Sequence, residues 1–257
     1  MRSPIGHQVN TDDEVLGVLH DAATAVRSAL DRLSDWGLAG DIGHQYTHDL
    51  VADAAAVPVL RRAGFGVVSE ESGVHDAGAA IVVVLDPVDG STNASRGLPW
   101  WNTSMCALDR DGPRVALVVD QTRGARYEAV RGGGARLDGQ PIAPTACTVA
   151  ADAVIGVNGY PRRHLGWKQY RALGATALDL CAVASGVLDG YVDCTRRGSS
   201  PWDYLGGMLV CLEAGAVMAD ANGGDLVATE RGELRIPVAA ATPELLADLL
   251  ARREKIS

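Results

Sequence analysis

The segment LDPVDGSTNAS, residues 85–95, ends a run of apolar residues with two aspartates, Asp86 and Asp89. The run, residues 79–85, is continuous and rich in β-branched side chains, which is typical of a strand covered on both faces. Because Pro87 has no N–H to donate to a neighbouring strand, we expect the strand to end at Asp86. The carboxylates would then lie at the C-terminal edge of a sheet, where ligands bind in open α/β folds.

Two aspartates held this close repel each other, and burial raises the pKa of each unless a cation or hydrogen-bond donors compensate. Mg²⁺ binds a few carboxylates together with water and substrate phosphate. Asp86, Asp89 and the Val88 carbonyl offer such an ion oxygens on one side of a turn. Residues 90–92 then supply backbone N–H groups and hydroxyls where a phosphate can lie. The alternative is a turn in which an aspartate serves only as a local cap.

Acidic residues also follow or open two other apolar segments. Glu70 and Glu71 come directly after residues 65–69, and Asp203 opens the helix-like stretch 204–214. This recurrence favours one shared site over three unrelated turns.

Four segments together resemble the inositol monophosphatase family, a group of Mg²⁺-dependent, lithium-sensitive phosphatases related to fructose-1,6-bisphosphatase. They are SEES at 69–72, DPVDGSTN at 86–93, the stretch 174–191 and WDYLGG at 202–207. They occur in the family's order and at similar separations, and the resemblance extends from about Asp12 onward. It implies an α/β (α+β) fold built as a layered αβαβα sandwich, and a homodimer.

The resemblance also implies roles for individual residues. The first Mg²⁺ ion would be bound by Glu70, Asp86 and the Val88 carbonyl, and the second by Asp86, Asp89 and Asp203, with two or three ions in all. Glu70 and the Ser91 hydroxyl would act on the attacking water. The implied substrate-binding residues are Gly90, Ser91, Thr92, Gly174, Ala175, Thr176 and Asp203.

The segment HQYTHDLVAD, residues 44–53, departs from the family's upstream pattern because it lacks a lysine and has shortened spacing to the next motif. The acidic partner of Ser91 is expected here, and either Asp49 or Asp53 can take that role. The expected place of Asp53 at the start of a helix favours it slightly. For either residue the alternative is a carboxylate that only stabilises the helix N-terminus.

Arg196 stands where inositol monophosphatases have an acidic residue, seven positions before Asp203. A guanidinium cannot accept hydrogen bonds from ring hydroxyls, but it binds a second anionic group well. Arg196 therefore favours a substrate more acidic than plain inositol monophosphate. The alternative is that Arg196 points to solvent.

Composition excludes several classes of function. The net charge of −9 over 257 residues argues against nonspecific binding to nucleic acid. Residues 1–10 lack the apolar core of a leader, and the chain nowhere has an uninterrupted apolar span of the ~18 residues that a membrane helix needs. We therefore expect a cytoplasmic protein without membrane contact.

The histidines and cysteines do not suggest a metal site. His44 and His48 are expected to be solvated loop residues. The five cysteines are scattered without C-x-x-C spacing, so neither zinc nor a disulfide framework is indicated.

Local patterns predict two helices followed by a meander of hairpins. The first helix runs from Asp12 to about Leu33 with Thr11 as its cap, and the second covers residues 51–63 with an early turn or a kink at Pro58. The expected meander strands are 104–108, 114–120, 126–130 and 135–137. The elements expected later are strands 154–157, 191–194, 216–219 and 236–240 and helices 175–187, 204–214 and 243–253. A division near Ala150 gives domains 1–150 and 151–257.

Taken together, these features predict a Mg²⁺-dependent phosphomonoesterase that hydrolyses a small phosphorylated polyol or related metabolite, most simply of the inositol monophosphate type, by metal-activated water. One alternative is a phosphatase of the same superfamily that acts on 3′-phosphoadenosine 5′-phosphate, histidinol phosphate or a sugar bisphosphate, because fold and metal core do not determine the substrate. A second alternative is a metal-binding homologue that has lost catalysis.

Overall fold

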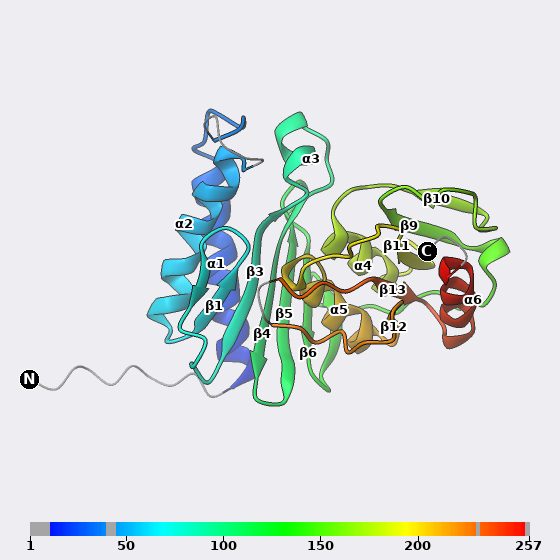
Figure 1. The fold of residues 1–257 in the computed structure, drawn as a ribbon. Coiled ribbons are helices and arrows are strands. Elements are labelled where there is room, and N and C mark those ends of the chain that lie inside the picture. The colour runs from blue at the N-terminus through cyan, green and yellow to red at the C-terminus, as the bar shows by residue number, and fades with distance from the viewer. Residues whose placement is uncertain (1–10, 40–44, 230–231, 255–257) are drawn as a thin grey trace, which may run out of the picture.

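The computed structural model describes residues 11–39, 45–229 and 232–254 and stacks them in five layers (Figure 1). From left to right in Figure 1 the layers are a helix pair, an eight-stranded sheet, a second helix pair, a five-stranded sheet and the last helix. This arrangement confirms the layered αβαβα sandwich. Its helices are α1 (Asp12–Leu30), α2 (Thr47–Arg62), α3 (Ser91–Arg96), α4 (Thr176–Ala184), α5 (Pro201–Ala214) and α6 (Pro243–Glu254), with a 3-10 turn over Ala150–Asp152.

The eight-stranded sheet contains the predicted meander. Its strand order is β2-β1-β3-β4-β5-β6-β7-β8, and only the β1 and β3 pair is parallel. The strands are β1 (Gly66–Ser69), β2 (Gly73–His75), β3 (Val82–Asp89), β4 (Asn102–Asp109), β5 (Gly112–Asp120), β6 (Arg126–Val130), β7 (Gly134–Leu137) and β8 (Gln140–Pro141). The short strands β2 and β8 and the short helix α3 lack a periodic pattern long enough to predict.

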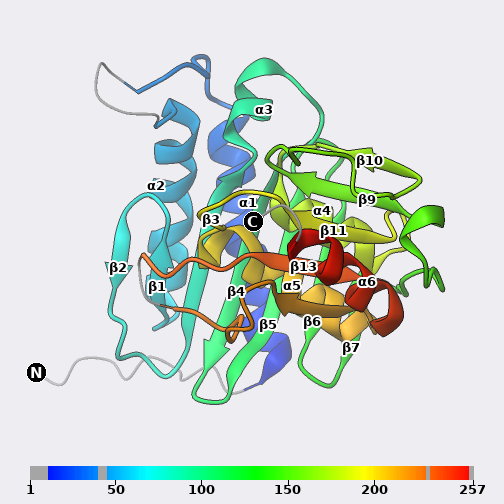
Figure 2. The same ribbon diagram turned by 45° about the vertical axis from the view of Figure 1, so that its right-hand side comes forward.

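The five-stranded sheet has the order β10-β9-β11-β13-β12. Its strands are β9 (Val154–Asn158), β10 (Gln169–Arg171), β11 (Gly190–Asp193), β12 (Val217–Asp220) and β13 (Pro237–Ala240). The helix α6 covers the outer side of this sheet, as Figure 2 shows, and β10 forms one edge. Of these strands, only the exposed three-residue β10 was absent from the sequence-based expectation.

The strand β3 is buried on both faces, as its apolar run predicts. Val83 and Leu85 belong to the core beneath α1 and α2, whereas Val84 belongs to the core beneath α4 and α5. The expectation that β3 ends at Asp86 is wrong, because the strand continues to Asp89. Its register to β4 shifts between these two aspartates. The shift forms a bulge, which accommodates the missing N–H of a proline within a sheet.

The helix α1 begins as predicted, with Thr11 and Glu14 forming a reciprocal capping box. The second helix starts at Thr47, four residues earlier than expected, and Pro58 lies inside it. Its N-terminus is set by Asp49, whose carboxylate accepts the Tyr46 N–H at 3.2 Å. Asp53 therefore lies in the second turn of α2 and not at its start.

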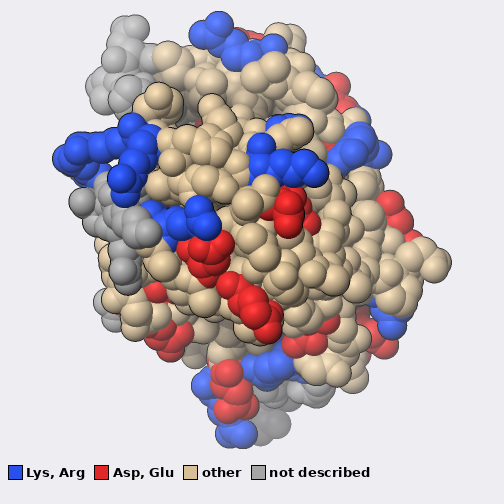
Figure 3. Space-filling view, turned by 90° about the vertical axis from the view of Figure 1, so that its right-hand side faces the viewer, with Lys and Arg blue, Asp and Glu red and all other residues tan. Residues whose placement is uncertain are grey.

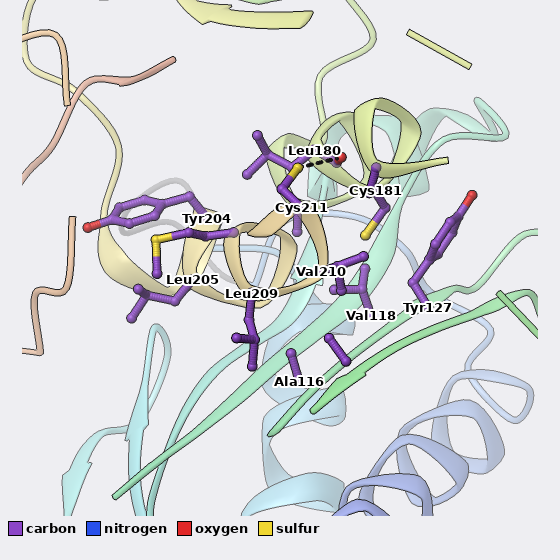
Figure 4. Packing of buried hydrophobic residues seen from close by; sticks show 14 of the residues in the cluster. Ala116, Val118, Tyr127, Leu180, Cys181, Tyr204, Leu205, Leu209, Val210 and Cys211 are labelled. Carbon is purple, nitrogen blue, oxygen red and sulfur yellow. Dashed lines mark hydrogen bonds between the residues drawn. The ribbon is translucent and has the colours of Figure 1, made fainter. Parts of the chain in front are cut away.

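The middle helices α4 and α5 pack on the eight-stranded sheet although they belong to the second half of the chain. Figure 4 shows Leu209 and Val210 of α5 facing the strand that carries Val118. The thiol of Cys211 donates to the Leu180 carbonyl of α4 at 3.0 Å. The two halves share this core, and a division near Ala150 stays a prediction.

Charge is mixed on the face beyond α6. Lys and Arg side chains gather over the upper part of this face and Asp and Glu lie mainly below them (Figure 3). Among the described residues, the helices include none long and apolar enough to cross a membrane. Residues 1–10, where the sequence was examined for a leader, lie outside the described ranges.

Candidate active site

Three carboxylates from three elements converge at the end of β3. Glu70 follows β1, Asp86 lies in β3, and Asp203 lies in the first turn of α5. Because β1 and β3 are parallel, with Ser69 opposite Leu85, the first two carboxylates leave the sheet at the same edge. One oxygen from each of the three side chains lies within 4.8 Å of the others. The structure thus brings together three of the residues that the sequence predicts as metal ligands.

The helix α5 positions Asp203 through its capping box. Asp203 Oδ2 accepts the Ser200 N–H at 2.7 Å, and Pro201 occupies the first turn, where its missing N–H costs nothing. The helix begins before Trp202, earlier than the sequence suggested. Asp203 therefore sits inside the first turn, and one of its oxygens belongs to the cluster.

Without a cation, the carboxylates of this cluster repel one another and, among the described residues that line the adjoining cavity, have no positive charge to compensate them. Burial, followed by repulsion from Glu71 and Asp49, raises the pKa of Glu70 to about 7. Burial and the neighbouring carboxylates raise the pKa of Asp86 and of Asp203 well above the usual range. Within the described ranges, no lysine or arginine lines the cavity beside Glu70. Closely spaced oxygen ligands without a basic neighbour fit a hard divalent cation such as Mg²⁺.

Asp89 faces a different set of partners. Its Oδ2 accepts the Asn102 amide and the Ala177 N–H, both at 2.8 Å, and its Oδ1 accepts the Thr176 N–H at 3.2 Å. Asp89 therefore holds the N-terminus of α4 against β3. Burial raises its pKa to about 6, and these hydrogen bonds oppose the rise. A metal-binding role for Asp89 stays a prediction.

The acidic residue beside Ser91 is Asp49. The Ser91 hydroxyl lies 2.8 Å from Asp49 Oδ1 and 2.8 Å from the Val88 carbonyl oxygen, so its single proton is shared between two acceptors. Burial raises the pKa of Asp49 to about 6. Asp53 instead accepts a short hydrogen bond from the Ser69 hydroxyl, which holds the end of β1. The structure thus places Asp49, and not Asp53, next to Ser91.

His48 is not the solvated loop residue that the sequence suggested. It lies in α2, is fully buried, and packs between Trp36 and Tyr46 at ring-centre distances of 5.1 and 5.0 Å. Its Nε2 is 3.3 Å from Asp49 Oδ1. Burial lowers its pKa, so the ring stays neutral. No local pattern distinguishes this histidine from a solvated one, and the other candidate, His44, lies outside the described residues.

Asp49, Glu70 and Ser91 border a cavity of about 530 Å³. The predicted site residues along its wall are Asp49, Glu70, Gly90, Ser91, Thr92 and Gly174. The sequence did not single out Gln45 and Tyr46, which also line it, and the Tyr46 hydroxyl lies 3.3 Å from Thr92 Oγ1. Arg196 is exposed, does not line this cavity, and forms no ion pair with any described residue.

Position 90 favours glycine over any residue that has a Cβ. Its φ is +92°, and an added Cβ would lie 3.1 Å from the Ala175 Cβ, the Trp100 carbonyl oxygen and the Trp101 Cβ. The turn into α3 is therefore pressed against the segment that leads into α4. Asn93 fastens the same junction by donating to the Trp100 and Leu173 carbonyls at 2.7 Å each.

A family model described as the inositol monophosphatase family matches residues 49–257. The chain belongs to the inositol monophosphatase family. The match includes every predicted metal ligand and both halves of the fold, and it makes the protein a phosphatase. The family's phosphatases are metal-dependent, and the cluster of Glu70, Asp86 and Asp203 can hold a metal ion.

Curated relatives carry several names. The chain is 32% identical over 214 residues to a fructose-1,6-bisphosphatase of Pyrococcus furiosus, covering 80% of this chain and 82% of that protein. It is 32% identical over 213 residues to a fructose-1,6-bisphosphatase/inositol-1-monophosphatase of Archaeoglobus fulgidus, covering 79% and 82%. It is 30% identical over 191 residues to the Nus factor SuhB of Escherichia coli, covering 66% and 69%.

Solved structures share the fold over nearly the whole chain. A hypothetical protein of Pyrococcus horikoshii with similarities for inositol-1 monophosphatase has a TM-score of 0.79 and 28% identity, covering 93% of this chain and 96% of that one. The inositol monophosphatase of Anabaena has a TM-score of 0.81 at 21% identity, covering 95% and 97%, which shows the fold alone.

Proposed function

We propose that this protein is a Mg²⁺-dependent phosphomonoesterase that hydrolyses a small phosphorylated polyol of the inositol monophosphate type. The observation that carries the proposal is the cluster of Glu70, Asp86 and Asp203, because its Glu70 lines the same cavity as the hydrogen-bonded pair Ser91 and Asp49. Carboxylates that repel one another at a site without basic side chains favour cation binding over a purely structural role.

The proposed ligands follow the placement of these oxygens. We assign Glu70, Asp86 and the Val88 carbonyl to one ion and Asp86, Asp89 and Asp203 to a second, so that Asp86 would serve both. Bound Mg²⁺ would lower the pKa of water and neutralise the charge of the phosphate and of the leaving oxygen. We propose two or three ions. Val88 also accepts from Ser91 here, so this carbonyl would tie the hydroxyl to the metal-binding turn.

The chain's own groups would orient the water and the phosphate. Asp49 and the Val88 carbonyl accept the hydrogen bond of the Ser91 hydroxyl, which leaves lone pairs of the Ser91 oxygen to accept a hydrogen bond from the attacking water. Gly90 and the segment of Gly174 come together at the cavity, so their backbone can approach a phosphate closely. We assign substrate contact to Gly90, Ser91, Thr92, Gly174, Ala175 and Thr176.

Phosphate release from simple monoesters, measured with and without Mg²⁺, tests the proposal. Mg²⁺-dependent release is the expected result. The alternative of a metal-binding homologue without catalysis predicts Mg²⁺ binding, measured by calorimetry, with no release from any ester. By the family resemblance, we also expect Li⁺ to inhibit at saturating substrate.

The substrate itself is tested with a panel that includes inositol monophosphate, fructose 1,6-bisphosphate, 3′-phosphoadenosine 5′-phosphate and histidinol phosphate. Relatives named for fructose-1,6-bisphosphatase support including the sugar bisphosphate.

If Arg196 binds a second anionic group of the substrate, Arg196→Glu should lower kcat/KM for a bisphosphate about tenfold and leave kcat/KM for the monophosphate nearly unchanged. Arg197→Glu is the matched control. If kcat/KM changed equally for both esters, Arg196 would not contact the substrate and would point to solvent.

A further inference from the structure

A groove lined by arginines lies outside the candidate active site. It has a volume of about 340 Å³ and runs between the side of α1 and the connection from β5 to β6. Its cations are Arg27, Arg123 and Arg126, and hydroxyl groups of α1 and of the β5–β6 turn stand beside them. His20 also lines the groove, and its Nε2 lies 2.8 Å from Glu128 Oε1. Of the residues that the structure describes, those that line the groove include no carboxylate. In a chain with a net charge of −9, such a concave basic surface requires an explanation.

The arginines retain donors for a ligand. Arg27 contacts Asp31 at 2.9 Å and Arg123 contacts Asp120 at 2.7 Å, each through Nε. Arg126 is exposed and forms no ion pair with any residue that the structure describes. Each guanidinium has five N–H donors in a planar fork that matches phosphate oxygens. The groove therefore offers one uncompensated charge and unused donors from two further arginines.

A buried chain of hydrogen bonds leads from this groove to the proposed metal-binding turn. Arg27 donates to the Gln121 carbonyl, and the Gln121 side-chain amide donates to Thr103 Oγ1 at 2.9 Å. Thr103 Oγ1 in turn donates to the Pro87 carbonyl at 2.8 Å, between the two aspartates of the turn. Gln121 and Thr103 are 2% and 0% exposed, so the inner links of the chain are shielded from solvent.

A second connection runs through Trp100. The Arg123 guanidinium lies over this indole at 5.9 Å from the ring centre. The Trp100 carbonyl accepts from Asn93 at 2.7 Å and faces Gly90, where an added Cβ would be 3.1 Å away. Arg123 of this groove thus contacts Trp100, whose carbonyl lies against Gly90 in the turn that we propose to bind phosphate.

We propose that this groove binds a phosphoryl dianion, either inorganic phosphate or a phosphorylated metabolite, and that its occupancy lowers turnover at the active site. An anion draws Arg27 and Arg123 toward itself and so loosens their contacts with Gln121 and Trp100. The metal-binding turn then loses part of its support. The binding step is independent of the proposed function, whereas the effect on turnover rests on it.

Calorimetric titration of metal-free protein tests the binding step, because without a cation the carboxylate cavity repels phosphate. Inorganic phosphate and glycerol 2-phosphate, each in a chloride background, should bind at one saturable site. Arg126→Ala should weaken this binding about tenfold, the loss of one charged hydrogen bond. Arg110→Ala is the matched control, since this exposed arginine lies in the turn at the opposite end of β5.

The two probes distinguish the sources of the ligand. Tighter binding of phosphate assigns the groove to the product, and tighter binding of the ester assigns it to a metabolite. Absence of saturable binding, or equal binding by wild type and Arg126→Ala, would overturn the proposal.

Inhibition kinetics with the Mg²⁺-loaded enzyme test the coupling. Phosphate should act as a mixed inhibitor of the wild type, lowering kcat a few-fold at saturation, and only as a competitive inhibitor of Arg126→Ala. Gln121→Met keeps the groove but breaks the chain to Thr103, so it should bind phosphate in the metal-free titration and yet show competitive inhibition only. Mixed inhibition unchanged in Gln121→Met would refute the coupling. Binding without any phosphatase activity would instead count against the proposed function alone.

Discussion

At the scale of single residues, Asp86 lies among several negatively charged neighbours. It is buried beside Glu70, Asp89 and Asp203, each of which raises its pKa after burial itself. We expect Asp86→Asn to abolish Mg²⁺-dependent phosphate release and to raise the melting temperature of the metal-free protein, because one of several repelling carboxylates is removed. Phosphate release and thermal unfolding measure the two effects. Turnover at the wild-type rate would remove Asp86 from the proposed metal site.

Asp49 and Asp53 lie one helical turn apart in α2 but contact different hydroxyls. Because Asp49 contacts Ser91, Asp49→Asn should lower kcat by about 10²-fold or more and change KM little, as expected for a group that assists proton transfer. Asp53→Asn is the matched control and should affect mainly stability, through its bond to Ser69. Steady-state kinetics of both variants decide between them, and a larger loss of kcat in Asp53→Asn would reverse the assignment.

At the scale of elements, α5 approaches its neighbours through two glycines. A Cβ on Gly206 would lie 2.4 Å from Ser104 Oγ of β4, and a Cβ on Gly207 would lie 2.7 Å from the Ala177 carbonyl oxygen of α4. This close approach brings the first turn of α5, and with it Asp203, up to the end of β3.

A pair of glycine substitutions tests that packing. Gly207→Ala should lower the free energy of unfolding by about 1–3 kcal/mol, because the backbone of α4 must shift. Gly17→Ala in α1 meets nothing within 4 Å and should raise this free energy by up to about 1 kcal/mol, through helix propensity alone. Chemical denaturation measures both, and a neutral Gly207→Ala would show that the two helices are not in rigid contact.

At the scale of the whole molecule, the buried carboxylates link folding to pH. Glu70 has its pKa raised to about 7, and Asp49 and Asp89 have theirs raised to about 6. The folded protein therefore binds more protons than the unfolded chain over this range. For the metal-free protein we expect the contribution of these groups to stability to be greatest below about pH 4 and to be lost as pH rises to about pH 7.

Thermal unfolding of metal-free protein across that range measures the effect. Added Mg²⁺ should restore the melting temperature most strongly at the upper end, where the carboxylates are ionised and bind the ion without releasing protons. Asp86→Asn should flatten the pH dependence. A melting temperature that rises from pH 5 to pH 7 without metal would show that the cluster is not the dominant titrating unit.

The sequence by itself determined the elements whose signals are local. The β-branched run before Asp86 predicts a buried strand, Thr11 predicts the start of α1, and the spaced turns after Thr103 predict the meander, because each depends only on neighbouring residues. The acidic motifs likewise mark Glu70, Asp86 and Asp203 as one site, because they follow the order and the approximate separations of the family's motifs.

Only the tertiary structure decided which of these groups meet and how each is used. Asp49 reaches Ser91 across 42 positions of sequence because α2 packs beside β3, and Asp53 is turned to Ser69 instead. His48 is buried because Trp36 and Tyr46 close over it. Such contacts depend on the packing of whole elements in three dimensions. The spacing of residues along one segment carries no record of that packing.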